Sequence, residues 1–326
     1  MEYIRLGRSN VKVSRLGLGA MGFGSTSWRE WVLDEASAAP IIDRAIEHGI
    51  NFFDTCDFYS NGESERILGN LLVGKYPRDS FVLATKAGNP MASHPNGRGY
   101  SRKHLFNAID QSLSRLRTDH VDLFQTHIWN PDTDLEELVD AMGAIVDAGK
   151  ARYVGVTTMP AWTLAVCRHH AQGRKSAQFI SMQCEYNPAH RECESELVPY
   201  CLHEDIALIP FSPMARGFLS ADRREGKNPT SRTRSDDYTH KYYYREGDFA
   251  IQAILDRVAE RHGVSASQVS LAWTLSRPGI TAPIFGATSV HHVDEAVSAL
   301  DLTLSEAEMA EISAAYMSRG FNSTGH

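Results

Sequence analysis

The chain has 326 residues, of which 42% are hydrophobic, and a formal net charge of −7. These values suit a globular protein with a sizeable core, in one large domain or two small ones. The sequence has no basic cluster and no apolar run of membrane-spanning length, which argues against nucleic-acid and membrane partners. Five cysteines without a C-x-x-C pair favour a reducing, cytoplasmic setting over a disulfide framework or a thiolate zinc site.

The first half of the chain alternates short apolar runs with amphipathic segments. A turn cluster at 7–10 predicts a small β-hairpin within residues 3–13. Core strands are predicted at 15–24 and from Asn51, Phe81 and Val121. Helices are predicted at 34–48, 63–73, 101–117 and 134–148. Asp34 and Ser101 are the expected N-caps of two of these helices.

The alternation continues through the second half of the chain. The predicted strands are 151–157, 179–183, 206–211 and 280–285. The predicted helices are 161–170, 194–203, 248–262, 266–276, 290–299 and 305–316. A polar segment at about 220–247 follows the seventh strand, and a loop of this length is usually a lid or a binding loop.

Eight short strands, each followed by a helix, predict an α/β protein of the (β/α)8 TIM-barrel type. The barrel would carry an N-terminal β-hairpin, a long loop after strand seven and extra C-terminal helices. A doubly wound sheet is the alternative, because residues 16–22 are glycine-rich. The residues after that cluster do not open a helix, which favours the barrel. No linker-like stretch divides the chain, so we expect a single domain over residues 1–326.

Three strands in a row end on an ionisable residue, namely Asp54, Lys86 and His127, and Tyr59 follows the first of them. The carboxyl ends of barrel strands surround one pocket, so these four side chains can converge. A phenol has a pKa of about 10. We expect Lys86 to lower that pKa, with Asp54 orienting the ammonium and His127 either orienting a carbonyl or sharing the proton. Such a group would protonate an oxygen on which negative charge develops.

Each of these residues also has a structural interpretation. An isolated Asp54 is as well explained by a turn, and an isolated His127 or Tyr59 by packing. Lys86 in an apolar strand is less easily explained, because burying an ammonium is costly. The joint spacing on consecutive strands favours a catalytic group of four. The pairs at 169–170 and 291–292 consist of adjacent histidines on predicted helices, which do not face one site, so no metal site is expected.

Several segments in the same order resemble the aldo-keto reductase family, from Tyr3 to about Tyr316. The matching segments are 51–59, 84–86, 122–127, 149–156, 183–187, 211–219 and 283–289. Within the family, the chain looks most like bacterial enzymes related to potassium-channel β-subunits. The resemblance implies a TIM barrel that reduces aldehydes or ketones with NAD(P)H, with Tyr59 as general acid assisted by Lys86, Asp54 and His127. A reduction needs such a cofactor in any case, because no side chain supplies a hydride.

The resemblance also implies a set of cofactor-binding positions. Gly22 and Asp54 match the ribose contacts, Thr157, Thr158 and Gln183 the carboxamide contacts, and Phe211 the residue that stacks on the nicotinamide. Ser212, Met214, Arg216, Gly217 and Leu219 match the pyrophosphate segment, and Gly286, Thr288, Ser289, His292 and Glu295 the adenosine end. Many relatives carry an arginine or lysine near 286–292 for the 2′-phosphate of NADPH, and this chain has none there. NADPH is expected, with NADH as the alternative.

Aromatic and amide side chains in the loops on the pocket side are the substrate-contact candidates: Trp28, Trp31, Phe58, Trp129 and Asn130. Ordinary loop packing explains them equally well. The expected partner is a small carbonyl or alcohol substrate, and the chain would be a monomer or a homo-oligomer. Two alternatives to an oxidoreductase remain open: a slow regulatory subunit that keeps the cofactor, and a lyase using Lys86 as a Schiff base. The sequence does not identify the substrate or the preferred direction of the reaction.

Overall fold

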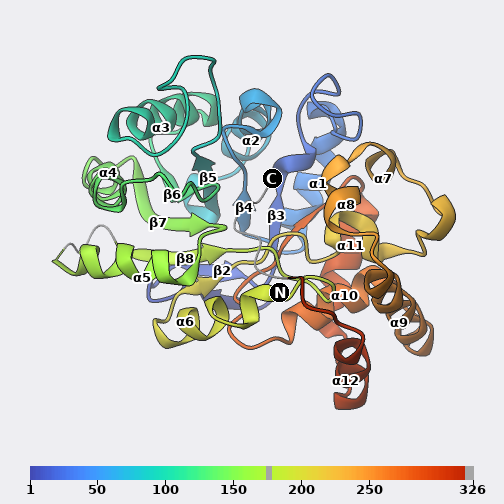
Figure 1. Cartoon of the computed structure of the whole chain (residues 1–326). Helices are drawn as coiled ribbons and strands as arrows, with labels where there is room; N and C mark the ends of the chain where they lie inside the picture. Colours follow the sequence, from blue (N-terminus) through green and yellow to red (C-terminus); the bar gives the residue numbers. More distant parts are fainter. Residues whose placement is uncertain (174–177, 320–326) are drawn as a thin grey trace.

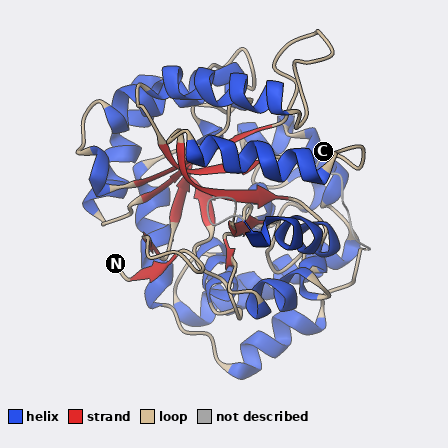
Figure 2. Cartoon of the chain, turned by 90° about the vertical axis from the view of Figure 1, so that its left-hand side faces the viewer, coloured by secondary structure: helices blue, strands red, loops and turns tan. Residues whose placement is uncertain are grey.

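A barrel of parallel strands forms the centre of the molecule. The computed structural model describes residues 1–173 and 178–319. The strands pair in the order β10-β3-β4-β5-β6-β7-β8-β9, and single bridges from Leu208 to Ile280 and from Phe211 to Ile284 close the ring. Helices lie around the outside of these strands (Figures 1 and 2). The expected (β/α)8 barrel is confirmed.

The barrel strands are short and nearly all buried. They are β3 Gly17–Gly19, β4 Phe52–Asp54, β5 Val82–Ala87, β6 Val121–Thr126, β7 Ala151–Thr157, β8 Phe179–Gln183, β9 Ala207–Leu208 and β10 Ile284–Gly286. The last two are shorter than the predicted runs 206–211 and 280–285. Pro210 and Pro283 explain this difference, because proline has no N–H to give to a neighbouring strand.

The helices follow the predicted order with small changes in their bounds. They are α1 Glu35–Glu47, α2 Glu63–Leu68, α3 Arg102–Leu116, α4 Leu135–Asp147, α5 Ala161–His170, α6 Leu197–His203, α7 Ser231–Ser235, α8 Asp237–Tyr242, α9 Glu246–His262, α10 Ala266–Leu275, α11 Val290–Ser298 and α12 Glu306–Ala314. The predicted caps are confirmed: Asp34 accepts a hydrogen bond from Ser37 N, and Ser101 accepts one from His104 N.

Two helix predictions need correction. The predicted helix 63–73 ends as α2 at Leu68 and continues as a π-helical turn, because Gly69 lies against α3. A Cβ at Gly69 would stand 2.6 Å from the carbonyl oxygen of Arg115. The polar segment 220–247, expected to be an irregular loop, contains the short helices α7 and α8. Among the described residues, no helix combines the length and apolar character needed to cross a membrane.

The hairpin β1 Tyr3–Arg5 and β2 Lys12–Ser14 covers the amino-terminal end of the barrel. Its Leu6 and Val13 join an inner apolar cluster with strand residues such as Phe52 and Ile180. Gly7 has a φ of +56°, and a Cβ there would lie 2.4 Å from the carbonyl oxygen of Ile180. The hairpin therefore needs glycine at this turn, and it leaves the opposite, carboxyl-terminal end of the barrel open for a site.

Candidate functional site

Strand alternation decides which side chains enter the barrel. Phe52 belongs to the inner cluster and Phe53 to the outer one, so Asp54 faces inward again. The same alternation along β5 directs Lys86 inward, two residues after Ala84. β4 pairs with β5 in a register that sets Asp54 beside Ala84, so Lys86 lies one layer above Asp54. The carboxylate and the ammonium are thus stacked at the carboxyl-terminal end of the barrel.

Lys86 is fully buried and makes three polar contacts. Its Nζ donates to Asp54 Oδ2 at 2.5 Å and to the carbonyl oxygen of Thr55 at 2.8 Å, and it lies 3.5 Å from Tyr59 Oη. Burial by itself would lower the pKa of Lys86, but the charge of Asp54, the charges of Tyr59 and Cys56 and the hydrogen bond to Asp54 together outweigh burial and raise it. Lys86 therefore stays a cation at neutral pH.

Asp54 is also held from two distant strands. Its Oδ1 accepts hydrogen bonds from Gln125 at 3.2 Å and from Gln183 at 3.0 Å. Both carboxylate oxygens therefore have donors, as a buried carboxylate requires. These contacts fix the orientation of the carboxylate beneath Lys86.

The Tyr59 side chain reaches the ammonium of Lys86 from a turn rather than from a strand. Tyr59 begins a tight 3-10 turn in which Ser60 and Asn61 both have positive φ. Its ring lies 5.6 Å from the ring of His127, edge to face. Burial raises the pKa of Tyr59 to about 12, although the ammonium of Lys86 acts to lower it. The prediction that Lys86 lowers the pKa of Tyr59 below its ordinary value is therefore wrong, because desolvation of the phenolate outweighs the attraction of one ammonium.

A network that the sequence analysis did not predict holds His127. The amide nitrogen of Asn89 makes a short hydrogen bond to His127 Nδ1, and Cys56 Sγ lies 3.0 Å from the same atom. An amide nitrogen only donates, so Nδ1 is the acceptor and the ring proton is assigned to Nε2. The Tyr100 hydroxyl accepts hydrogen bonds from the backbone N–H groups of His127 and Ile128. The imidazole therefore has one preferred tautomer.

A cavity of about 670 Å³ opens above these residues. Asp54, Tyr59 and His127 line it, and Lys86 is packed among them with no exposed surface. The predicted cofactor and substrate residues that line it are Gly22, Thr157, Thr158, Gln183, Phe211, Ser212, Met214, Arg216, Gly217, Gly286, Thr288, His292, Glu295, Trp28, Trp31 and Phe58. Segments far apart in the sequence thus form one continuous wall.

Four predicted residues lie outside that lining. Trp129 packs edge to face against the exposed Trp162, and Asn130 accepts a hydrogen bond from the Asp132 backbone within its own loop. Leu219 is buried, and Ser289 caps α11 through a hydrogen bond from His292 N. These four have structural partners of their own, so their proposed contacts stay predictions.

A cluster of three arginines around one carboxylate forms part of the cavity wall. Asp236 Oδ2 lies 2.8 Å from Arg216 and 3.2 Å from Arg232, and Asp236 Oδ1 lies 3.9 Å from Arg29. Burial lowers the pKa of Arg232 to about 9, with Arg216 acting in the same direction. Three cations face one anion, so this wall attracts negatively charged ligands. Among these residues the sequence analysis identified only Arg216.

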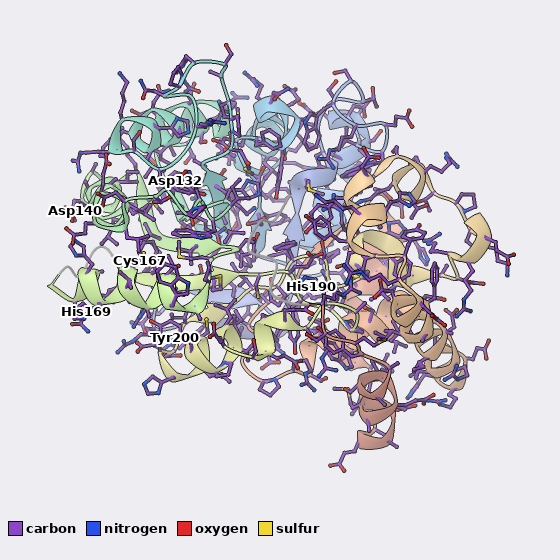
Figure 3. The ribbon with its side chains drawn as sticks, viewed as in Figure 1. Asp132, Asp140, Cys167, His169, His190 and Tyr200 are labelled. Carbon is purple, nitrogen blue, oxygen red and sulfur yellow. The ribbon has the colours of Figure 1, made fainter. Side chains whose placement is uncertain are left out.

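Metal binding finds no support in the described part of the chain. No group of three or more histidine, cysteine or acidic side chains there could hold an ion. His169 lies on α5 at the edge of the molecule, whereas His190 lies near its middle (Figure 3). His190 is 3.5 Å from Glu192 and 4.0 Å from Glu185, so its neighbours are two carboxylates.

The residues missed by the sequence analysis left only weak signals. Asn89 stands three residues after Lys86, and Arg29 stands between two tryptophans, Trp28 and Trp31. Both lie in loops, where no periodicity shows which way a side chain points. Their importance follows from the contacts described above.

Comparison with known proteins identifies the family and several relatives of the chain. A model of the aldo/keto reductase family matches residues 15–317. Versiconal hemiacetal acetate reductase from Aspergillus parasiticus is 37% identical, with 99% of each chain covered. Aldo-keto reductase dtxS3 from Metarhizium robertsii is 37% identical over 94% of this chain and 89% of the relative. A Schizosaccharomyces pombe protein, named provisionally as an aryl-alcohol dehydrogenase, is 34% identical over 95% of this chain and 94% of its own length.

These relatives are fungal proteins. They give no support to the expected likeness to bacterial enzymes related to channel β-subunits. The likeness to the family itself is confirmed, because the match spans the barrel from before β3 to beyond α12. The chain belongs to the aldo/keto reductase family.

Proposed function

We propose that this chain is an NAD(P)H-dependent reductase of aldehydes and ketones that also oxidises the corresponding alcohols. The observation that carries the proposal is the contact of Lys86 Nζ with both Asp54 and Tyr59, at 2.5 Å and 3.5 Å. Family membership and the reductase names of the relatives support the reaction class. A lyase that used Lys86 as a Schiff base would need a neutral amine, whereas the pKa of Lys86 is raised.

Tyr59 is the proton donor in this proposal. Its pKa of about 12 keeps the phenol protonated at neutral pH, as a general acid requires. When the proton moves to the substrate oxygen, the phenolate that remains lies beside the ammonium of Lys86. Asp54 keeps that ammonium charged and in place. The negative charge formed during reduction is thus stabilised by a group that is already oriented.

His127 orients the carbonyl in this proposal. Its Nδ1 accepts a hydrogen bond from Asn89, so the ring proton is on Nε2, and this N–H would donate to the carbonyl oxygen. Its ring lies edge to face against Tyr59, so one oxygen atom can approach both donors. Asn89 and Cys56 act on the reaction through His127 rather than directly.

The cavity suits an extended dinucleotide with a charged centre. A bound nicotinamide supplies the hydride. Thr157, Thr158 and Gln183 would hold its carboxamide, and Phe211 would stack on its ring. The residues proposed for the remaining parts are Gly22 and Asp54 for the ribose, Ser212, Met214, Arg216 and Gly217 for the diphosphate, and Gly286, Thr288, His292 and Glu295 for the adenosine. The excess positive charge around Asp236 supports placing the diphosphate beside Arg216.

We propose NADPH as the cofactor, with NADH as the alternative. The family resemblance supports NADPH, whereas the side chains near the expected 2′-phosphate position do not distinguish the two cofactors. Thr288 Oγ1 lies 3.2 Å from His292 Nδ1, and partial burial lowers the pKa of His292, so this imidazole is largely neutral at pH 7. A neutral pair offers hydrogen bonds to either a hydroxyl or a phosphate, without the charge of a guanidinium.

We also propose that the chain acts as one domain in the cytoplasm. The family match runs over residues 15–317 without a break, which supports one domain. All five cysteines are buried free thiols, which supports a reducing compartment.

The test is nicotinamide absorbance with a panel of aldehydes and ketones, using NADPH and NADH in parallel. Tyr59→Phe should lower kcat by about 10²–10⁴-fold, because it removes the transferred proton but keeps the ring. Cofactor binding, followed by fluorescence titration, should be unchanged in this variant. The ratio of the two rates identifies the preferred cofactor.

Two outcomes would contradict the proposal. Tight cofactor binding without turnover of any carbonyl would indicate a regulatory subunit. Full activity in the Tyr59→Phe variant would assign the proton to another donor.

A further inference from the structure

We infer that Arg29 binds an acidic group of the substrate, and that the preferred substrates are aromatic aldehydes or ketones carrying a carboxylate or a similar anion. The inference rests on the proposed reductase function and specifies its substrate class. It depends on the segment Trp28 to Trp31, which lies between β3 and α1 and lines the cavity.

Arg29 lies close to the proposed proton donor. Its guanidinium carbon is 4.5 Å from the ring centre of Trp28. The Trp28 ring is in turn 6.5 Å from the ring of Tyr59. Trp28 therefore lies close both to Arg29 and to the proposed proton donor.

The guanidinium of Arg29 has one carboxylate neighbour, and only at long range. In residues 1–173 and 178–319 it makes no hydrogen bond, and its ion pair with Asp236 Oδ1 spans 3.9 Å. That oxygen has no hydrogen-bond partner in the described structure, whereas Asp236 Oδ2 is bound by Arg216 and Arg232. The Arg29 side chain is only 33% exposed, so water solvates its five N–H donors incompletely. An anion in the cavity would satisfy them.

The three arginines have different surroundings. Arg216 and Arg232 each lie within 3.2 Å of Asp236 and belong to the segment that follows β9. The diphosphate of the cofactor is proposed to bind beside Arg216. Arg29 belongs to the segment between β3 and α1 and stacks on Trp28, whose ring is 6.5 Å from the ring of Tyr59, so we assign it to the substrate. Carboxylates pair well with a guanidinium, because two parallel hydrogen bonds can form.

The rest of the substrate would be aromatic. Trp28 and Phe58 meet edge to face with ring centres 6.0 Å apart, and both line the cavity beside Tyr59. Flat apolar walls of this kind favour a ring. The substrate would then have its carbonyl at Tyr59, its ring against Trp28 and its acidic group at Arg29.

The experiment compares two substrates that differ only in charge, 4-carboxybenzaldehyde and its methyl ester, in the wild-type protein and in Arg29→Gln. The acid should be the better substrate of the wild type. Arg29→Gln should lower kcat/KM for the acid by about tenfold or more, chiefly through KM, because a charge-assisted hydrogen-bond pair is lost. The ester should change little. Arg29→Lys should fall between, since lysine keeps the charge without the fork.

Matched controls separate this role from others. Arg66→Gln alters an arginine on α2 whose side chain is 53% exposed and lies outside the cavity lining, and it should leave both substrates unaffected. The NADPH dissociation constant, measured by fluorescence, should be the same in Arg29→Gln and the wild type. Benzoate, which cannot be reduced, should bind about tenfold more weakly to Arg29→Gln, whereas benzamide should not.

Three results would overturn the inference. The first is a wild type that reduces the acid no better than the ester. The second is an Arg29→Gln variant that impairs both substrates equally and binds NADPH more weakly, which would assign Arg29 to the cofactor. The third is benzoate binding that is unchanged by the substitution. Each of these leaves the proposed reductase function intact, whereas a wild type that reduces no carbonyl at all would remove both.

Discussion

Buried ionisable side chains have the largest effects at the scale of single residues. Asp57 is 1% exposed, and its Oδ2 is a buried oxygen without a hydrogen-bond partner in the described structure. Burial, followed by the negative charge of Glu65, raises the pKa of Asp57 to about 7. An aspartate in the unfolded chain has a pKa of about 4. The folded state therefore binds more protons than the unfolded state between these two values, and folding loses stability as the pH rises through this window.

Asp57→Asn should remove this dependence. The amide keeps an acceptor for Cys56 Sγ, which lies 3.3 Å from Asp57 Oδ1, and carries no charge to desolvate. We expect the variant to be more stable than the wild type by about 1–3 kcal/mol at pH 8, with the difference shrinking as the pH approaches 5. Urea unfolding at the two pH values measures it. An equal difference at both would show that ionisation of Asp57 is not the cause.

At the scale of elements, short polar signals locate the helices. Asp134 precedes α4 and accepts hydrogen bonds from the backbone N–H groups of Glu136 and Glu137, both at 3.0 Å. The buried face of α4 includes Leu138 and Met142, which pack in the outer core. The cap supplies acceptors for N–H groups that have none within the helix, and packing supplies most of the remaining stability.

Asp134→Ala should destabilise the protein by about 1 kcal/mol, because it removes both cap hydrogen bonds. Its catalytic constants should stay the same, since α4 lies outside the cavity lining. Asp132→Ala is the matched control. Asp132 is an exposed residue of the same loop (Figure 3). Its substitution should lower the free energy of unfolding by a few tenths of a kcal/mol at most. Urea unfolding compares the two, and equal losses would argue against a capping role.

At the scale of the whole molecule, one buried cluster connects the long segment after β9 to the barrel. Glu185, just beyond β8, accepts hydrogen bonds from Tyr243 at 2.6 Å and from Tyr238 at 2.8 Å. Asn187 donates to the same Tyr243 hydroxyl at 2.9 Å. The segment contributes Arg216 and Arg232 to the cavity, so this connection holds part of the proposed cofactor site in place.

Tyr243→Phe should loosen that segment. It leaves Glu185 and Asn187 each without one buried partner, which costs about 1–3 kcal/mol. Trypsin should cut within 220–247 several times faster, and NADPH should dissociate faster in stopped-flow fluorescence. Tyr242→Phe is the control, because no hydrogen bond of the Tyr242 hydroxyl is seen in the described structure. Equal cleavage rates in wild type and Tyr243→Phe would show that the hydroxyl does not anchor the segment.

The elements and their order could be predicted because their signals are local. Strands β7 and β8 and helix α5 have the expected bounds, since each is a periodic run between turn residues. Asp54, Lys86 and His127 could be grouped because parallel strands that follow one another in the chain are neighbours in the barrel. The expected bacterial branch of the family is not supported, because the relatives reported above are fungal.

The sequence by itself determined the barrel, its hairpin and the four residues at its mouth, because periodicity, caps and strand order are properties of neighbouring residues. Tertiary structure decided what depends on distance and burial. The bond from Gln183 to Asp54 joins residues 129 positions apart, and Arg29 meets Trp28 and Asp236 only in the folded loops. The high pKa of Tyr59 also belongs to the fold, because removing a phenol from water is an effect of everything packed around it.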